Sequence, residues 1–208
     1  MILTPANSSP RLILASSSVY RHSLLGRLCL PFDVAVPNID EQPLAGEAPQ
    51  DTALRLAREK AATVVRMHPG ALVIGSDQVA TLDGEQIGKP GTHANALAQL
   101  RRMQGRTVLF HTALCLWDGR RATPEAIQID TVSTAVTFRV FPEAALDAYL
   151  RIEQPYDCAG SAKNEGLGIA LIAKIDSSDP TALTGLPLIS LCSMLAHAGV
   201  VFFGSAAA

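Results

Sequence analysis

The side chains of this chain that could take part in chemistry are carboxylates and cations at the ends of predicted elements. The acids are Asp40, Glu41, Asp77 and Glu165, and the cations are Arg21, Lys60 and Lys89. Carboxylate oxygens bind hard cations such as Mg²⁺ or Mn²⁺, whereas Lys and Arg bind phosphate oxygens. Together they indicate a metal-dependent site for phosphorylated compounds, although these residue types alone specify no reaction.

One of these acids, Asp77, and one of these cations, Lys89, lie in the stretch from Leu72 to Pro90. Its apolar start predicts a buried strand, which we expect to end at Gly75–Gln78. Asp77 would then lie at a strand end, where loops commonly form binding sites. Asp83-Gly84 predicts a hairpin turn, and Lys89 follows between Gly and Pro. A fixed acid and a fixed cation around one turn suit an anionic substrate, but an ordinary turn with a solvated Asp and Lys explains the same residues.

The chain opens with a predicted strand, a serine turn and a helix. Residues 11–15 are mostly apolar, Ser16 to Ser18 offer N-cap candidates, and apolar residues recur at helical spacing over 19–28. Backbone N–H groups at such a helix start can hold a phosphate, and Arg21 in the first turn could reach it. A capped surface helix with a solvated Arg is the alternative.

The remaining pattern mixes strands and helices. Hydrophobic patterning predicts strands over 32–36, 107–117, 126–140 and 169–175, and helices over 50–67, 94–103, 142–151 and 188–198. The long alternation over 126–140 predicts an antiparallel partner strand. The fold class is therefore α/β with a mixed sheet rather than a simple doubly wound one. Lys60 falls within a predicted helix, where a solvated side chain would explain it equally well.

Composition limits the classes of protein to consider. The chain has 208 residues, 48% of them hydrophobic, and a formal net charge of −2, so a core is expected and a nucleic-acid partner is not. The four cysteines are scattered without a CxxC pair. Three have apolar neighbours that predict core packing, whereas Cys158 lies among more polar residues. We find no secretory signal and no long apolar span, so we expect a cytoplasmic, reduced protein without a membrane partner.

Six stretches together resemble the Maf family of nucleotide pyrophosphatases. In chain order they are LILASSSVYRHSLL, the Asp40-Glu41 pair, LAREKA, VIGSDQVATLDGEQIGKP, YDCAGSAKNEGLGI and SDPTALTGLPL. The resemblance implies an elongated mixed β-sheet flanked by helices, with two lobes around a central cleft, as in inosine triphosphate pyrophosphatases. It implies one bilobal catalytic domain over 11–203, between a flexible arm (1–10) and a flexible end (204–208), and a possible homodimer. The implied reaction is hydrolysis of a nucleoside triphosphate to the monophosphate and pyrophosphate, with a divalent metal, Mg²⁺ or Mn²⁺.

The resemblance also implies roles for individual residues. Asp77 matches the family's catalytic acid, a base for water, and shares metal binding with Glu41 of the early loop. Arg21, Lys60 and Lys89 match the cations that contact the triphosphate, and Ser16 matches the serine of the opening loop. These roles suit the chemistry, because hydrolysis at phosphorus needs a positioned water, a base and neutralisation of the leaving pyrophosphate.

At three positions the chain resembles the branch of the family that acts on 7-methyl-GTP. Enzymes of that branch remove a modified nucleotide from the nucleotide pool. The three residues are Tyr20, Gln78 and Glu165. N7-methylation makes guanine cationic, and a cationic ring stacked on an aromatic face gains about 0.5–2 kcal/mol. Glu165 could accept hydrogen bonds from guanine N–H groups, and Gln78 could make a further polar contact. The branch often has Trp where this chain has Tyr20, which offers a weaker stacking surface.

The sequence leaves two alternative functions open. One is the same reaction on dTTP, UTP or a broader set of modified nucleotides, against which the three branch residues argue. The other is a non-catalytic nucleotide-binding regulator of cell division. An intact Asp77 argues against that reading, because a pure binder needs no water-activating acid.

Overall fold

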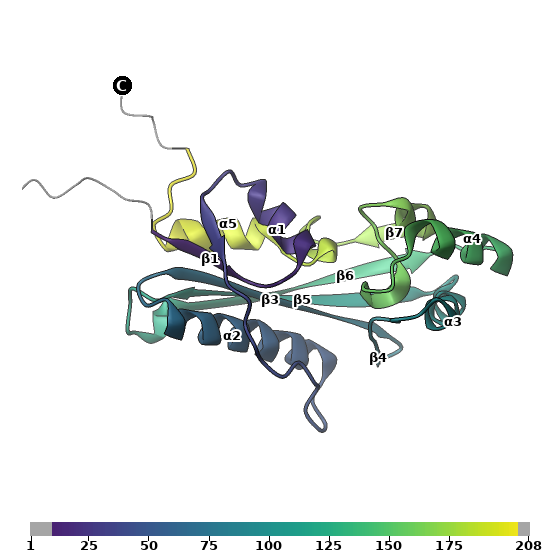
Figure 1. The fold of residues 1–208 in the computed structure, drawn as a ribbon, viewed down its shortest axis with the longest axis horizontal. Coiled ribbons are helices and arrows are strands. Elements are labelled where there is room, and N and C mark those ends of the chain that lie inside the picture. Colours follow the sequence, from purple (N-terminus) through teal and green to yellow (C-terminus); the bar gives the residue numbers. More distant parts are fainter. Residues whose placement is uncertain (1–9, 204–208) are drawn as a thin grey trace, which may run out of the picture.

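The computed structural model describes residues 10–203, so most of the predicted arm and the predicted flexible end lie outside it. One seven-stranded mixed sheet runs through the molecule in the order β2-β1-β3-β5-β6-β7, with β4 paired to β3 (Figure 1). The strands are β1 (Leu12–Ala15), β2 (Phe32–Val34), β3 (Leu72–Leu82), β4 (Glu85–Ile87), β5 (Thr107–Asp118), β6 (Ile127–Phe138) and β7 (Ile172–Asp176). β1 is parallel to β2 and β3, and the other pairs are antiparallel. The predicted α/β class is confirmed.

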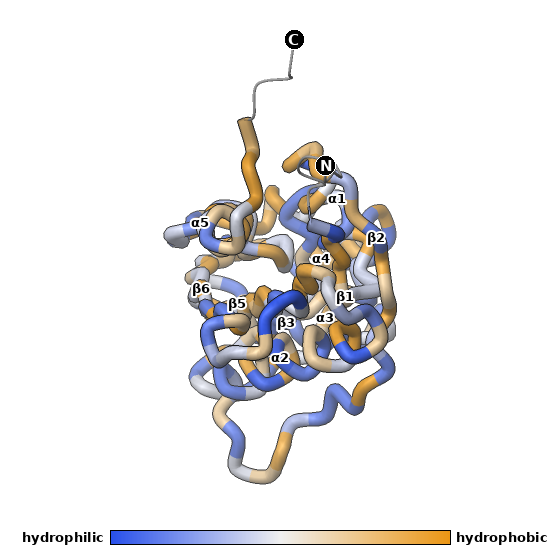
Figure 2. The backbone as a smooth tube through the Cα atoms, turned by 90° about the vertical axis from the view of Figure 1, so that its left-hand side faces the viewer, coloured by the Kyte–Doolittle hydropathy of each residue, from blue (hydrophilic) through white to orange (hydrophobic). Residues whose placement is uncertain are grey.

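Helices cover both faces of this sheet. They are α1 (Val19–Gly26), α2 (Pro49–Met67), α3 (His93–Met103), α4 (Glu143–Glu153) and α5 (Leu188–His197), with short 3-10 turns η1 (Pro124–Ala126), η2 (Ala159–Ser161), η3 (Leu167–Leu171) and η4 (Ala182–Thr184). In the end-on view, α1 and α5 lie on one side of β1, β3 and β5, and α2 lies on the other (Figure 2). Within residues 10–203, no helix combines the length and apolar character needed to cross a bilayer.

The local signals at turns and caps were mostly correct. Ser18 caps α1 by accepting a hydrogen bond from the Arg21 backbone N–H. Asp83 and Gly84 both have positive φ, as a tight hairpin turn between β3 and β4 requires. The predicted strand over 169–175 is wrong in its first half, where a 3-10 turn replaces it. Here a Cβ at Gly168 would lie 2.4 Å from the backbone of Lys163, so two chain segments meet too closely for a regular strand.

β3 is longer than the sequence predicts. The strand does not end at Gly75–Gln78 but continues to Leu82, which places Asp77 in its middle. β5 pairs with one edge of β3 along nearly its whole length, so β1 and β4 must share the other edge. β1 pairs with that edge only as far as Gly75, and β4 pairs with it only from Ala80 onward. Over 76–79 this edge has no strand neighbour in the described part of the chain, and the sheet is open beside Asp77.

The hydrophobic core is divided by the sheet and by this opening. One cluster joins α1 and α5 to the sheet around Leu14, Ile74 and Leu116, and a second joins α2 to the opposite face. A third cluster lies at the far end, where α3 and α4 pack around Phe110 and neighbouring side chains. The first two clusters thus lie on opposite faces of one part of the sheet, and the third lies at its other end. The division into two lobes stays a prediction. Of the cysteines expected in the core, Cys115 is buried, Cys192 is half-buried and Cys29 is exposed, so the expectation is wrong for Cys29.

Close packing of α2 depends on small residues. Its buried stripe includes Ala53, Ala57 and Ala61, which face β3. A Cβ at Gly75 would lie only 2.1 Å from the Ala57 carbonyl oxygen, so glycine is needed at this contact. The close approach brings Lys60 of α2 to the surface of the sheet.

Candidate active site

A cleft of about 530 Å³ lies at the opening in the sheet. Successive side chains of a strand point to opposite faces, so Asp77 faces α2 while Gln78 faces the side of α1 and η4. Because β3 lacks a neighbour here, one cleft reaches both faces. Nine of the residues predicted from the sequence line it: Ser16, Tyr20, Arg21, Glu41, Lys60, Asp77, Gln78, Lys89 and Glu165. Asp40 does not, and lies instead at a separate hollow beside Glu59 and Arg66.

Lys60 joins the two predicted acids. Its Nζ lies 2.6 Å from Asp77 Oδ1 and 2.7 Å from Glu41 Oε1, and its side chain is only 6% exposed. A solvated Lys60 is therefore the wrong reading. Asp77 Oδ2 has no hydrogen-bond partner among residues 10–203. Every buried side-chain oxygen in that range does have a partner, so Oδ2 is not buried and is open to the cleft.

The charge on Glu41 is set by its cationic neighbours. Desolvation raises its pKa, but the hydrogen bond and charge of Lys60, with the charges of Lys89 and Arg21, lower the pKa overall. Glu41 is therefore ionised at neutral pH. The three cations predicted to hold phosphate thus gather around the same acid.

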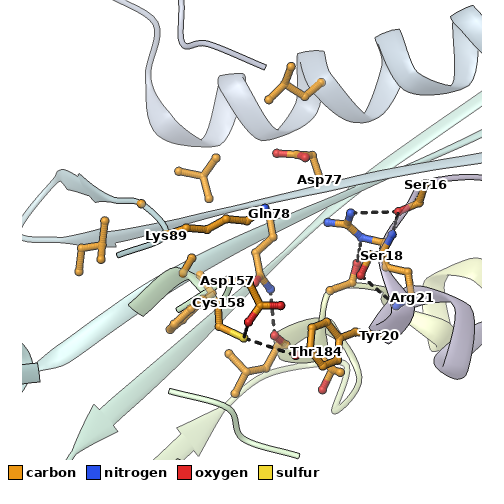
Figure 3. A pocket seen from close by; sticks show the side chains of 18 of the residues that line it. Ser16, Ser18, Tyr20, Arg21, Asp77, Gln78, Lys89, Asp157, Cys158 and Thr184 are labelled. Carbon is orange, nitrogen blue, oxygen red and sulfur yellow. Dashed lines mark hydrogen bonds between the residues drawn. The ribbon is translucent and has the colours of Figure 1, made fainter. Parts of the chain in front are cut away.

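Arg21 is held in place by the loop before α1 and by the loop after η4. Its Nε donates to the Gly185 carbonyl oxygen at 2.8 Å, and Nη1 lies 3.5 Å from Ser16 Oγ (Figure 3). Ser16 Oγ also accepts from the Ser18 backbone N–H at 3.1 Å. Burial lowers the pKa of Arg21, while the charges of Asp77 and Glu41 raise it. Nη2 has no partner in the described chain, so an anchored guanidinium faces the cleft rather than bulk solvent.

Tyr20 marks the other end of the cleft. Its hydroxyl lies 3.7 Å from Cys158 Sγ, which lies 3.5 Å from Asp157 Oδ1 (Figure 3). Burial, together with Cys158 and the nearby acids, raises the pKa of the Tyr20 phenol. Burial raises the pKa of Cys158 to about 11, so its thiol is protonated at neutral pH and is no candidate nucleophile.

This end of the cleft carries unpaired negative charge. Asp157 and Glu165 line it, and within residues 10–203 neither forms an ion pair. The ammonium of Lys163 lies 5.7 Å from the Tyr20 ring centroid but pairs with Glu153 at 3.2 Å. Sequence reasoning missed Asp157. Its position in YDCAGS, within a stretch that resembles the family, was the available signal.

Gln78 is anchored to the segment around η4. Its Nε2 lies 2.8 Å from Thr112 Oγ1 and 3.0 and 3.1 Å from the carbonyl oxygens of Ala182 and Leu183. The sequence analysis also missed the contribution of this segment, because every residue has a backbone carbonyl and residue types do not show which carbonyls will be used. Gly185, at φ 108°, additionally accepts from Ser76 Oγ at 3.0 Å.

A divalent cation would have few protein ligands here. In the described part of the chain, no group of three or more His, Cys, Asp or Glu side chains is arranged to hold a metal. Glu41 and Asp77 supply two carboxylates, and in the structure both contact Lys60. Such a donor set does not make a closed metal site. It does fit Mg²⁺ or Mn²⁺ that arrives with phosphate oxygens and water as its remaining ligands.

The chain is similar to several known proteins over most of its length. A protein called 7-methyl-GTP pyrophosphatase from Cupriavidus metallidurans is 64% identical over 200 residues, covering 96% of this chain and 99% of the relative. One of the same name from Ralstonia nicotianae is 63% identical over 186 residues, covering 89% and 94%. A solved structure of a nucleoside-triphosphatase/dITP/XTP pyrophosphatase from Mycobacterium abscessus is 16% identical, with a TM-score of 0.42. The match covers 91% of this chain and 97% of that one. The family model described as Maf-like protein matches residues 11–198, and the chain therefore belongs to the Maf-like family.

Proposed function

We propose that this chain hydrolyses nucleoside triphosphates to the monophosphate and pyrophosphate, and that 7-methyl-GTP is its preferred substrate. The observation that carries the proposal is the separation of charge along the cleft. Arg21, Lys60 and Lys89 gather at one end. At the other end, carboxylates that form no ion pair within residues 10–203 lie beside an aromatic ring. A triphosphate with a cationic base matches both ends. Four relatives at 60–64% identity are named 7-methyl-GTP pyrophosphatase, which supports the same substrate.

At the phosphate end, the proposed base is Asp77. Its Oδ1 is held by Lys60, which leaves Oδ2 to take a proton from a water that attacks phosphorus. Arg21 and Lys89 neutralise the phosphate oxygens as charge builds up on the leaving pyrophosphate. The hydroxyls of Ser16 and Ser18 accept hydrogen bonds from the Ser18 and Arg21 backbone N–H groups. Their own hydrogens, with the other N–H groups at the start of α1, are the donors that would orient the phosphates.

We further propose that the substrate binds with a divalent cation, Mg²⁺ or Mn²⁺. Glu41 and Asp77 are the carboxylates that would hold it. The ion supplies positive charge that neutralises phosphate oxygens.

At the base end, Tyr20 provides the stacking surface and Glu165 the complementary charge. Guanine methylated at N7 carries a positive charge, which an aromatic face attracts. The carboxylates of Asp157 and Glu165 add to this attraction because no ion pair neutralises them in the described chain.

The test is pyrophosphate release from 7-methyl-GTP, GTP, dTTP and UTP in parallel, with Mg²⁺, Mn²⁺ or EDTA. We expect a preference for 7-methyl-GTP that is reduced in Glu165→Gln and unchanged in Glu125→Gln, which alters an acid outside the cleft. Equal or better turnover of dTTP and UTP would refute the substrate assignment. Absence of turnover for all four, with nucleotide binding intact, would refute the enzymatic proposal in favour of a binding protein. Full activity in EDTA would refute the metal requirement.

A further inference from the structure

We infer that Thr112 is a specificity-determining positioning residue: its buried hydroxyl holds the Gln78 amide so that the cleft is offered only a hydrogen-bond acceptor. Thr112 on β5 lies directly opposite Gln78 on β3. It is 0% exposed and does not line the cleft, so it acts through Gln78. This inference rests on the proposed function and deepens it, because it states which edge of the base the enzyme recognises.

The orientation of the amide follows from the hydroxyl. Thr112 Oγ1 lies 2.9 Å from the Ala182 carbonyl oxygen and 2.8 Å from one terminal atom of Gln78. A carbonyl can only accept, so the hydroxyl gives its single hydrogen to Ala182 and must accept from Gln78. The Gln78 atom beside Thr112 is therefore Nε2.

The backbone around η4 agrees with that orientation. The same Gln78 atom lies 3.0 and 3.1 Å from the carbonyl oxygens of Ala182 and Leu183. An amide oxygen at that position would face two carbonyl oxygens and could bond to neither. A flipped amide is therefore excluded by the hydroxyl and by both carbonyls.

The opposite end of the amide is left to the cleft. No group in residues 10–203 donates a hydrogen bond to Gln78 Oε1. Every buried side-chain oxygen in that range has a hydrogen-bond partner, so Oε1 is not buried. Oε1 is therefore accessible, and Gln78 lines the cleft beside Asp157 and Thr184 (Figure 3). It presents an acceptor and no donor.

The carbonyls that complete this arrangement belong to a fixed segment. The buried carboxylate of Asp179 accepts from the backbone N–H of Ile189 at 2.7 Å and from Thr181 Oγ1 at 2.8 Å. Gly185 is bound by Arg21 and Ser76 on the other side of η4. Because the segment is held at both ends, it cannot rotate its carbonyls to suit a flipped amide.

An acceptor fixed in this way selects among bases. Guanine presents N–H donors at N1 and the 2-amino group, whereas adenine has an acceptor at N1. An amide free to rotate could form a hydrogen bond with either base. A fixed Oε1 can accept from guanine but is repelled by the lone pair of adenine N1, because both atoms are acceptors. Sites built for a particular hydrogen-bonding group discriminate strongly against analogues that lack it.

The test compares Thr112→Val and Thr112→Ser with wild type, using 7-methyl-GTP, GTP and ATP as substrates. Val would place a methyl group where an oxygen now lies 2.8 Å from Nε2, which is too close for a carbon, so the amide must leave its position. Ser keeps the hydroxyl. We expect the ratio of GTP to ATP kcat/KM to fall about tenfold in Thr112→Val and to be restored in Thr112→Ser. Thr134→Val is the matched control, since Thr134 is a buried sheet residue whose hydroxyl contacts Ser177 rather than Gln78.

The outcomes separate this inference from the proposed function. No preference of wild type for 7-methyl-GTP would refute the proposed function. If wild type shows that preference but Thr112→Val keeps the GTP to ATP ratio, or Thr134→Val lowers it equally, the inference is overturned while the function stands. A proportional loss for all three nucleotides would indicate structural damage alone and would also overturn it. Should Thr112→Val fail to fold, Thr112→Cys, whose thiol is a weak donor and acceptor, provides the same comparison.

Discussion

Lys60 and Asp77 form a buried ion pair between α2 and β3, with Nζ and Oδ1 2.6 Å apart. The two residues are 17 positions apart in the sequence. They meet because Gly75 lets α2 lie close to the sheet. Removing one partner of such a pair leaves the other charge buried, so these residues serve stability as well as chemistry. The pair also leaves one oxygen of Asp77 free in the cleft.

Asp77→Asn keeps the shape of the side chain but removes the proposed base. We expect turnover of 7-methyl-GTP to fall by about 10²–10⁴-fold, because general bases typically contribute that much. Nucleotide binding, measured by calorimetry, should persist. Asp176→Asn, at an exposed acid on β7, is the control and should retain full turnover. Wild-type turnover in Asp77→Asn would show that another group activates water.

Lys60→Met tests the stabilising role of the buried ammonium. Asp77 and Glu41 would then face each other without their shared partner, and we expect the free energy of unfolding to drop by about 3 kcal/mol. That value lies at the low end for buried pairs, because the Glu41 side chain is 56% exposed. Urea denaturation provides the measurement. Lys174→Met breaks an exposed pair with Asp176 and should cost less than about 1 kcal/mol. Equal losses in the two variants would contradict the buried-pair argument.

Gly75→Ala should separate α2 from β3. The new Cβ would overlap the Ala57 carbonyl and approach the Ala61 backbone nitrogen, so the helix must shift and carry Lys60 away from Asp77. We expect a loss of about 1–3 kcal/mol in unfolding free energy and a fall in turnover. The matched control is Gly26→Ala, at the end of α1, where an added Cβ meets no atom within 4 Å. Normal turnover in Gly75→Ala would mean that the site tolerates movement of α2.

Acid sensitivity should depend on Asp118 at the end of β5. The hydrogen bond from Arg120 lowers its pKa, against the opposing effect of burial, and its side chain is only 4% exposed. Because the folded pKa lies below the unfolded value of about 3.9, this stabilisation is present above pH 4 and is lost as pH falls through the folded pKa. Urea midpoints from pH 6 to pH 2.5 should therefore decline more steeply for wild type than for Asp118→Asn. Glu85→Gln, at an exposed acid on β4, should follow wild type. Parallel curves for wild type and Asp118→Asn would refute the role of Asp118.

Local sequence patterns were enough to predict the types of the secondary-structure elements and the resemblance to the family. Hydrophobic periodicity placed the long helices and strands, and Asp83-Gly84 and Ser18 gave the hairpin and the helix cap. These features depend on residues a few positions apart, so the sequence pattern carries them locally. The motifs likewise named the residues that the structure brings into one cleft, while their roles stay predictions.

Tertiary structure alone decided how those residues meet. A short polar run in an apolar strand resembles a strand end, so the sequence could not show that β3 continues past Asp77 or that its edge is open there. Burial of Lys60 depends on the close approach of α2, and the partners of Gln78 depend on the register between β3 and β5 and on carbonyls more than 100 residues away. Pairing edge, register and backbone direction are long-range properties, and residue types along the chain do not encode them locally.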